Sequence, residues 1–318
     1  MFSRSEITIE DQARYAGLIK SGNIEQALDE YIDKYVNPFV DEYSDKLAEF
    51  MQFVKDQEKS DTAAIIGIAA ATIGISTLLK NNFALITTLY TKYLTKDIKS
   101  DEVKQRILET ALNRFNEQID GTMSRTSQNV INAIREIQTS FITEEARLRS
   151  LGLRGQKVQD GVELFKKQVK IKFPNYEDMI KNKSFLKSTP DAKGITRNYQ
   201  IEPYIEKFIR TSILDVDRIS SEVSATTNGA LVVEYYKRDN RSVIKERVIC
   251  KRILKTNVFG LPLLALSEEV GKLLGIMTVD QAKNTPDYAM GSFCRHSIRP
   301  VSKEINNKIR GMLAEQAA

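Results

Sequence analysis

Residues 108–141 read LETALNRFNEQIDGTMSRTSQNVINAIREIQTSF, and their apolar spacing indicates how this chain folds. Large apolar side chains recur every three or four positions, at Leu108, Leu112, Phe115, Ile119, Val130, Ile134, Ile137 and Phe141. This period is that of one narrow stripe on an α-helix, with GTMSRTSQN as a weaker middle. Because Ser100, Asp101 and Glu102 form a good helix start, we predict one long polar helix towards Leu151. Such a helix packs in a bundle or pairs as a coiled coil, and bundle packing is the commoner outcome.

The preceding segment, DTAAIIGIAAATIGISTLLK at residues 61–80, carries no charge from Thr62 to Leu79. A membrane-spanning helix needs about 20 apolar residues, so this stretch lies at the lower edge of the required length. Its many small residues allow helices to pack closely. Two interpretations stay open: a helix buried on all sides in a bundle or oligomer, and a segment that contacts a membrane at one stage. The first is favoured because hydroxyl side chains lower the hydrophobicity and no aromatic belt flanks the segment.

Helical spacing continues on both sides of that segment. Asn81-Asn82 predicts a break before a second apolar helix, FALITTLYTKYL, and therefore a helical hairpin. Upstream, residues 24–35 and 47–54 have helical spacing on either side of an interruption at Asn37-Pro38. The first half is therefore predicted to be a helical bundle.

Glycines at positions 152, 155 and 161 predict a domain boundary, which divides the chain into a helical domain at 1–154 and a small α+β domain at 155–318. A helix is expected to open at Glu202-Pro203 and to end near Asn228-Gly229. LVVEYYK and VIKERVIC, separated by the turn-like RDNRS, alternate as two strands of a β-hairpin. Short helices are expected from Ser267 and near Thr278, and a last helix from Ser302 to Glu315. The predicted class is mainly α: an N-terminal bundle with long helices, then a small α+β domain with a basic hairpin.

The charge is unevenly distributed. Residues 1–150 carry 18 Lys and Arg against 23 Asp and Glu, while residues 151–318 carry 29 against 19, so the halves have net charges of −5 and +10. The predicted hairpin is the most basic segment, with Lys237, Arg238, Arg241, Lys245, Arg247, Lys251, Arg252 and Lys255. These cations either contact a DNA backbone without sequence readout, contact an acidic protein surface, or face solvent.

Few residues are suited to catalysis. No P-loop, dinucleotide-binding glycine motif, GxSxG or HExxH occurs, and the chain has one histidine and two cysteines. Two distant cysteines cannot form a disulfide framework, which favours a reducing compartment, and the N-terminal residues lack the apolar core of a signal peptide. Cys250, Cys294 and His296 are a weak candidate zinc site, since thiolate and imidazole are the usual zinc ligands. The alternative is that the thiols are buried and inert.

The second half resembles the minor capsid and head-morphogenesis proteins of tailed phages that are related to the F protein of phage Mu. RNYQIEPYIEKFIRTS at 197–212 is similar to a family helix with a tyrosine followed by Arg-Thr, here Tyr204, Arg210 and Thr211. GALVVEYYKRDNRS and RVICKRILKTNVFGL are similar to its strand, turn and cysteine segments. CRHSIRP resembles its closing signature, with Cys294, Arg295, His296 and Pro300. Lys251 and Arg252 follow Cys250 where members often carry a second cysteine, so the resemblance implies a partial zinc site at most.

The resemblance covers roughly residues 155–302 and implies a non-enzymatic structural role. It implies a minor capsid protein of a tailed phage or prophage, near the portal in the virion, which assists head assembly and DNA packaging or delivery. The partners would be the portal protein or major capsid protein, packaged DNA, and further copies of the chain, with assembly in the host cytoplasm. Two alternatives stay open: a membrane-active helical protein, in which residues 62–79 insert, and a phage-borne toxin or effector.

Overall fold

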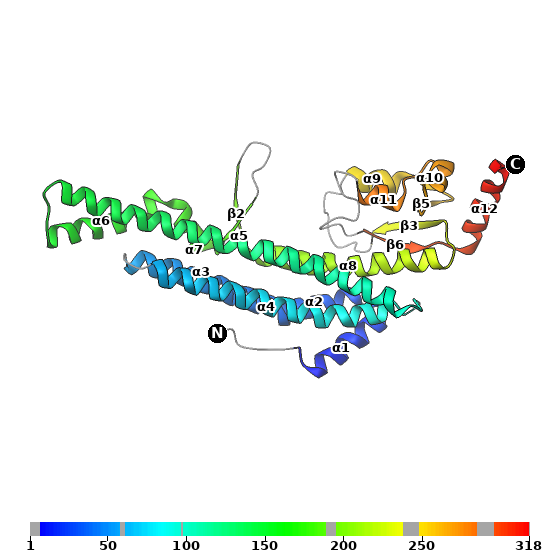
Figure 1. Ribbon diagram of the computed structural model, residues 1–318, viewed down its shortest axis with the longest axis horizontal. Helices are drawn as coiled ribbons and strands as arrows, with labels where there is room; N and C mark the ends of the chain where they lie inside the picture. The colour runs from blue at the N-terminus through cyan, green and yellow to red at the C-terminus, as the bar shows by residue number, and fades with distance from the viewer. Residues whose placement is uncertain are drawn as a thin grey trace. The chain divides into compact units, whose positions relative to one another are not determined.

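The computed structural model describes residues 7–57, 61–96, 98–188, 195–237, 248–284 and 296–317 (Figure 1). It is mainly α-helical with small β-sheets in the second half of the chain, which confirms the predicted fold class. The chain divides into two compact units. One comprises residues 1–8, 25–82 and 116–206, and the other 9–24, 83–115 and 207–318, so the division falls inside four helices.

Helices and one short sheet make up the first unit. Its elements include α2 (Ile24–Tyr35), α3 (Asn37–Gln57), most of α4 (Asp61–Leu94), the later part of α5 (Asp101–Ser150), α6 (Gln156–Lys172), α7 (Pro174–Asn182), β1 (Leu186–Lys187) and β2 (Asn198–Tyr199). Hydrogen bonds tie α7 to α3, where the hydroxyl of Tyr176 donates to the carbonyl of Met51 at 2.6 Å. The interruption at Asn37-Pro38 is confirmed, because α2 ends at Tyr35 and Pro38 lies in the first turn of α3.

α5 is one unbroken helix, as predicted from residues 108–141. Phe115, Ile119, Val130, Ile134, Ile137 and Phe141 are all buried, as the predicted stripe requires. Its first two members are wrong, because Leu108 and Leu112 are only half-buried and Ile107 and Ala111 are buried in their place. The weak middle also takes part, because Thr122, Met123 and Thr126 are buried and the Thr126 hydroxyl donates to the Thr122 carbonyl at 2.9 Å. The Thr126 hydroxyl thus enters an apolar interface with its donor satisfied, whereas the buried Thr122 hydroxyl has no hydrogen-bond partner among the described residues.

α4 is also continuous, so the predicted break at Asn81-Asn82 and the helical hairpin are wrong. Neither asparagine stops the helix, since asparagine in a helix interior costs only about 0.7 kcal/mol relative to alanine. The buried face runs straight through the pair, with Leu79, Asn82, Phe83 and Ile86 all buried. The packing of this buried face therefore outweighs the weak preference of asparagine for non-helical conformations.

The uncharged segment of α4 is not buried on all sides. Only 28% of its most apolar 18-residue window, which has a mean hydropathy of 2.0, is buried. One face contains Ile68 and Ile75, which are buried, whereas Ile66 and Ile73 are 63% and 68% exposed. The interpretation of a helix surrounded by its own bundle is therefore wrong for the described chain, while cover by another copy or a membrane remains a prediction. It is the one helix among the described residues with the length and composition to cross a membrane.

The predicted domain boundary lies in the turn between α5 and α6, where Gly152 and Gly155 adopt φ of 83° and 54°. This turn lies within the first unit. The division at residues 154 and 155 stays a prediction.

The second unit combines helices with an antiparallel sheet of order β4-β5-β3-β6. It contains α1 (Ile9–Lys20), the ends of α4 and α5, most of α8 (Glu202–Thr227), β3 (Val232–Lys237), α9 (Val248–Lys255), β4 (Asn257–Val258), β5 (Leu261–Ala265), α10 (Glu268–Leu274), α11 (Val279–Lys283), β6 (His296–Pro300) and α12 (Lys303–Ala317). The predicted bounds of α8 are confirmed. So are helix starts at Ser267, which accepts from the Val270 amide, and at Thr278, which forms a capping box with Gln281.

The predicted β-hairpin is wrong in its second strand. LVVEYYK does form β3, but β3 pairs with β5 and β6, and residues 248–255 form α9. Residues 238–247 lie outside the described part of the chain. The burial of residues 250–255 gives the physical reason. Cys250, Ile253 and Leu254 face inward, whereas Lys251, Arg252 and Lys255 are exposed. This spacing of three and four residues is that of a helix.

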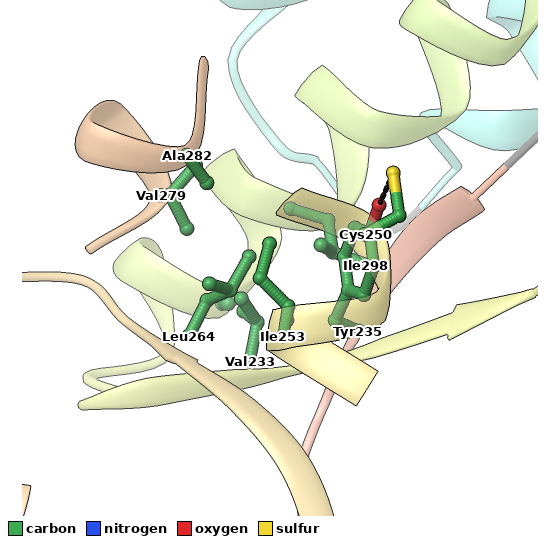
Figure 2. Close-up of a cluster of buried hydrophobic side chains, with 9 residues drawn as sticks. Val233, Tyr235, Cys250, Ile253, Leu264, Val279, Ala282 and Ile298 are labelled. Carbon is green, nitrogen blue, oxygen red and sulfur yellow. Dashed lines mark hydrogen bonds between the residues drawn. The ribbon is translucent and has the colours of Figure 1, made fainter. Parts of the chain in front are cut away.

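The sheet contributes to two apolar clusters. Val233, Tyr235, Leu264 and Ile298 pack with residues of α9, α11 and the end of α8 (Figure 2). Val232, Leu263 and Ala265 pack instead with residues of α10 and α12. The alternation along β3 and β5 thus places neighbouring residues in different cores.

Candidate functional site around Tyr235

Tyr235 brings two of the predicted metal ligands together. It is fully buried on β3, and its hydroxyl lies 3.3 Å from the Cys250 sulfur, to which it donates (Figure 2). Its ring stacks on the imidazole of His296, with ring centroids 4.9 Å apart and planes inclined by 12°. Cys250 and His296 are therefore neighbours of the same side chain, although they are far apart in the sequence.

The third predicted ligand, Cys294, lies outside the described residues. Among the residues that the structure does describe, no group of three or more His, Cys, Asp and Glu side chains is arranged to hold a metal ion. A zinc site on Cys250 and His296 would need Cys294 and a fourth donor. Zinc binding therefore stays a prediction.

Cys250 itself is 2% exposed and lies in the cluster with Ile253, Leu264 and Ile298. A thiol in such surroundings packs as a small apolar side chain. Its contact with Tyr235 gives that hydroxyl an acceptor in a core where an unmet donor would be costly. The local arrangement is suited to holding β3, α9 and β6 together.

The closing strand β6 is also bonded to α8. Arg218 Nε donates to the His296 carbonyl oxygen at 2.8 Å, and Arg218 Nη1 pairs with Asp215 Oδ1 at 2.8 Å. Arg114 of α5 contacts the other oxygen of Asp215. Arg218 and Asp215 are buried, so each depends on the other for compensation of its charge. The next residue of β6, Ser297, also bonds to α8, because its Oγ donates to Asp217 Oδ2 at 2.6 Å.

These charged residues of α8 were not identified from the sequence. The available signal was DVDR at 215–218, which places three charges within an otherwise apolar part of the helix. Arg299 was also missed: both of its donating nitrogens lie 2.9 Å from Glu234 across the β3–β6 pair, and this raises the pKa of Arg299. CRHSIRP is therefore, in its described part, a closing strand fixed by side-chain bonds.

The predicted basic surface is described only in part. Lys251 and Arg252 are exposed on α9, as is Lys255, and Lys237 ends β3. Arg238, Arg241, Lys245 and Arg247 lie outside the described residues. The described cations thus belong to a helix and a strand end, and their contact with DNA or a portal surface stays a prediction.

The residues of the family resemblance occupy separate places. Tyr204 is half-buried beside Tyr199, with ring centroids 5.8 Å apart, and burial raises the pKa of its phenol. Thr211 is buried on α8, and Arg210 is partly exposed beside it. Pro300 pairs in register with Val233 at the end of β6. Arg295 lies beyond the described residues.

Comparisons of this chain with protein-family models, with curated proteins and with solved structures found no match.

Proposed function

We propose that this protein is a structural, non-catalytic minor capsid protein of a tailed phage or prophage, situated near the portal. In this role it assists head assembly and DNA packaging or delivery. Its partners would be the portal or major capsid protein and the backbone of the packaged DNA. The proposal starts from the resemblance of residues 155–302 to head-morphogenesis proteins.

The observation that carries the proposal is the convergence of the resembling segments on one core. Tyr235 of β3, Cys250 of α9 and Ile298 of β6 belong to a single buried cluster, together with Ala225 at the end of α8. Tyr235, Cys250 and Ile298 come from three of the four segments that carry the resemblance, and Ala225 lies later on α8, the helix that contains most of the fourth segment. Motifs that share a core form a folding unit, whereas chance matches need not meet in space.

The exposed cations of α9 support a polyanionic partner. Lys251 and Arg252 are exposed, and the half of the chain from residue 151 has a net charge of +10. A basic surface attracts DNA without sequence readout, because each neutralised phosphate releases counterions. The same charge would suit an acidic portal surface.

The test is sedimentation of the native source material after nuclease treatment, with peptide mass spectrometry across the gradient. We expect peptides from both halves of the chain to peak with particles that retain nuclease-resistant DNA. Peptide ratios to the major capsid protein would then give the copy number. Peptides that stay in soluble or membrane fractions would overturn the proposal.

A second function, membrane contact through α4, is favoured by one observation. Ile66 and Ile73 are more than half exposed within an uncharged segment, where a soluble bundle would normally place polar side chains. An exposed apolar face of this kind can lie against lipid. We expect the wild-type protein to float with liposomes if this function holds.

A matched pair of variants makes this second test specific. Ile66→Gln with Ile73→Gln removes the apolar face of α4, while Leu164→Gln with Ile171→Gln removes the same number of exposed apolar side chains from α6. Membrane contact through α4 predicts loss of flotation for the first pair alone. Equal loss in both would indicate nonspecific adsorption, and no flotation of the wild type would exclude this function.

A further inference from the structure

A polar groove of about 830 Å³ lies in the first unit, away from every residue discussed as a site above. Residues of α5 form one side, and residues from the α6–α7 junction, β1 and the start of β2 form the others. This volume is within the range of about 300–1,000 Å³ that is usual for ligand sites. The lining is largely polar and charged, so an apolar ligand does not suit it.

The charged side chains of the groove favour an anion. Arg125, Lys172, Lys187 and Arg197 line it against Glu136 and Asp178, and all four cations are exposed. Arg125 lies on α5, Lys172 ends α6, and the other two belong to the short sheet and the residue before it. Cations contributed by separate elements surround a ligand rather than forming a single stripe along one helix.

Amide side chains supply the second feature of the lining. Gln128, Asn129 and Asn132 follow Arg125 at helical spacing on α5, and Asn175 and Asn198 line the groove from other elements. An amide both donates and accepts hydrogen bonds. The half-buried ring of Phe173 also lines the groove and meets Phe165 edge to face, with centroids 6.4 Å apart.

The walls of the groove are fixed by internal hydrogen bonds. Asn129 Nδ2 donates to the Phe185 carbonyl at 3.0 Å and to Asn198 Oδ1 at 3.3 Å, which ties the short sheet to α5. The backbone of Arg197 is bonded to Ser188 in both directions, at 2.8 and 3.0 Å. A site whose walls are already ordered pays less conformational entropy when a ligand binds.

We propose that this groove binds single-stranded nucleic acid. The cations meet phosphates, the two carboxylates and the amide atoms not used in bonds within the wall meet base edges, and Phe173 offers a ring for stacking. Bases present donors as well as acceptors, so Glu136 and Asp178 can bond exocyclic amino groups. An acidic peptide fits less well, because its side chains offer acceptors only and would be repelled by those carboxylates. A duplex keeps its base edges paired and stacked, away from such a lining.

The proposal is tested by fluorescence anisotropy of labelled single-stranded DNA of mixed sequence with the full-length protein. We expect Lys187→Glu with Arg197→Glu to weaken binding by about 10-fold or more and to reduce its salt dependence, since two phosphate contacts are lost. The matched control is Arg135→Glu with Lys157→Glu, which changes the net charge equally at exposed helix positions outside the groove. The control should bind within about twofold of the wild type.

A third variant separates stacking from charge. Phe173→Leu should weaken binding by roughly fivefold or more, with the salt dependence unchanged, because a stacked base is lost but no phosphate contact is. Circular dichroism before each titration establishes that the variants remain folded. A Phe173 variant with wild-type affinity would remove the stacking role.

Three outcomes would overturn the proposal. Equal weakening by the groove pair and the control pair would mean that net charge alone attracts the strand. Tighter binding of a labelled duplex of the same sequence, unaffected by the groove pair, would place the contact elsewhere. Displacement of the strand by polyglutamate at equal concentration would instead identify a site for acidic peptides. None of these results depends on whether the protein sediments with phage heads, so this inference and the proposed function can fail separately.

Discussion

α4 and α5 are the two longest helices of this protein, and they place their apolar residues in opposite ways. α5 is polar apart from one narrow stripe, and that stripe is buried from Phe115 to Phe141. Nearer the start of the helix, Ile107 and Ala111 are buried, while Leu108 and Leu112 are half-buried. α4 carries no charge and no narrow apolar stripe from Thr62 to Leu79, yet its Ile66 and Ile73 are exposed. A narrow stripe tells which face will be buried, whereas uniform hydrophobicity tells only that burial is favourable.

The largest expected effect is on the buried stripe of α5. Phe115→Ala should lower the free energy of unfolding by about 3–5 kcal/mol, because a large buried ring is lost and a cavity remains. Phe115 is fully buried, and its ring centroid lies 3.7 Å from that of Phe83 in α4. Urea denaturation followed by circular dichroism measures the change.

Ile142→Ala is the matched control on the same helix, because Ile142 is 62% exposed. Its cost should stay below about 0.5 kcal/mol. A cost similar to that of Phe115→Ala would mean that the polar side of α5 is covered by another molecule in solution.

The next effect should be a gain in stability on α4. Asn82 is 1% exposed, and within the described part of the chain its Nδ2 has no hydrogen-bond acceptor. Asn82→Leu should raise the free energy of unfolding by about 1 kcal/mol, because it replaces a buried unsatisfied donor by an apolar side chain with the same number of non-hydrogen atoms. The neighbouring Asn81→Leu, at an exposed position, should give no gain. A loss of stability for Asn82→Leu would show that its amide makes a needed contact.

A smaller effect concerns the polar link between the two helices. Ser76 donates to Asp120 at 3.0 Å and Lys80 donates to it at 2.6 Å, and these bonds, that of Lys80 first, hold the Asp120 pKa below its usual value. Asp120→Asn should cost less than about 1 kcal/mol at neutral pH, since the carboxylate is largely exposed and solvent screens the pair.

The pH dependence of this effect has a definite sign. A carboxylate whose pKa is lowered on folding stabilises the protein above its unfolded pKa, about 3.9 for aspartate, and that stability is lost as the pH falls through the folded pKa. The difference between wild type and Asp120→Asn should therefore shrink below about pH 4. Urea midpoints measured over an acid pH series test this, and a difference that grows on acidification would contradict the lowered pKa.

The smallest effect should come from the exposed face of α4. Ile73→Ala should change the free energy of unfolding by no more than about 0.5 kcal/mol, because Ile73 is 68% exposed and alanine is a good helix former. A loss above about 2 kcal/mol would mean that this face is covered in solution. Analytical ultracentrifugation would then show whether the cover is a second copy of the chain.

Residue patterns within short stretches of sequence predicted the helices, because helical hydrogen bonds join residues that are close in the sequence. The stripe at 108–141 identified α5, Glu202-Pro203 and Asn228-Gly229 bounded α8, and Ser267 and Thr278 marked two helix starts. Each of these depends on residues within one or two helical turns, which a sequence displays directly. Cys250 and His296 were also identified as residues that could meet, although not through Tyr235.

The tertiary structure decided the rest, because burial and strand pairing depend on residues far away in the chain. The segment after Lys237 alternates like a strand, but both neighbours of β3 are supplied by residues beyond 260, and 248–255 are left to form a helix. Asn82 could enter α4 because distant side chains bury it. The groove beside Arg125 likewise exists only where α5, α7 and the short sheet meet. The sequence by itself determined which segments are helical and which residues are chemically distinctive, while packing between distant segments determined which of them share a site.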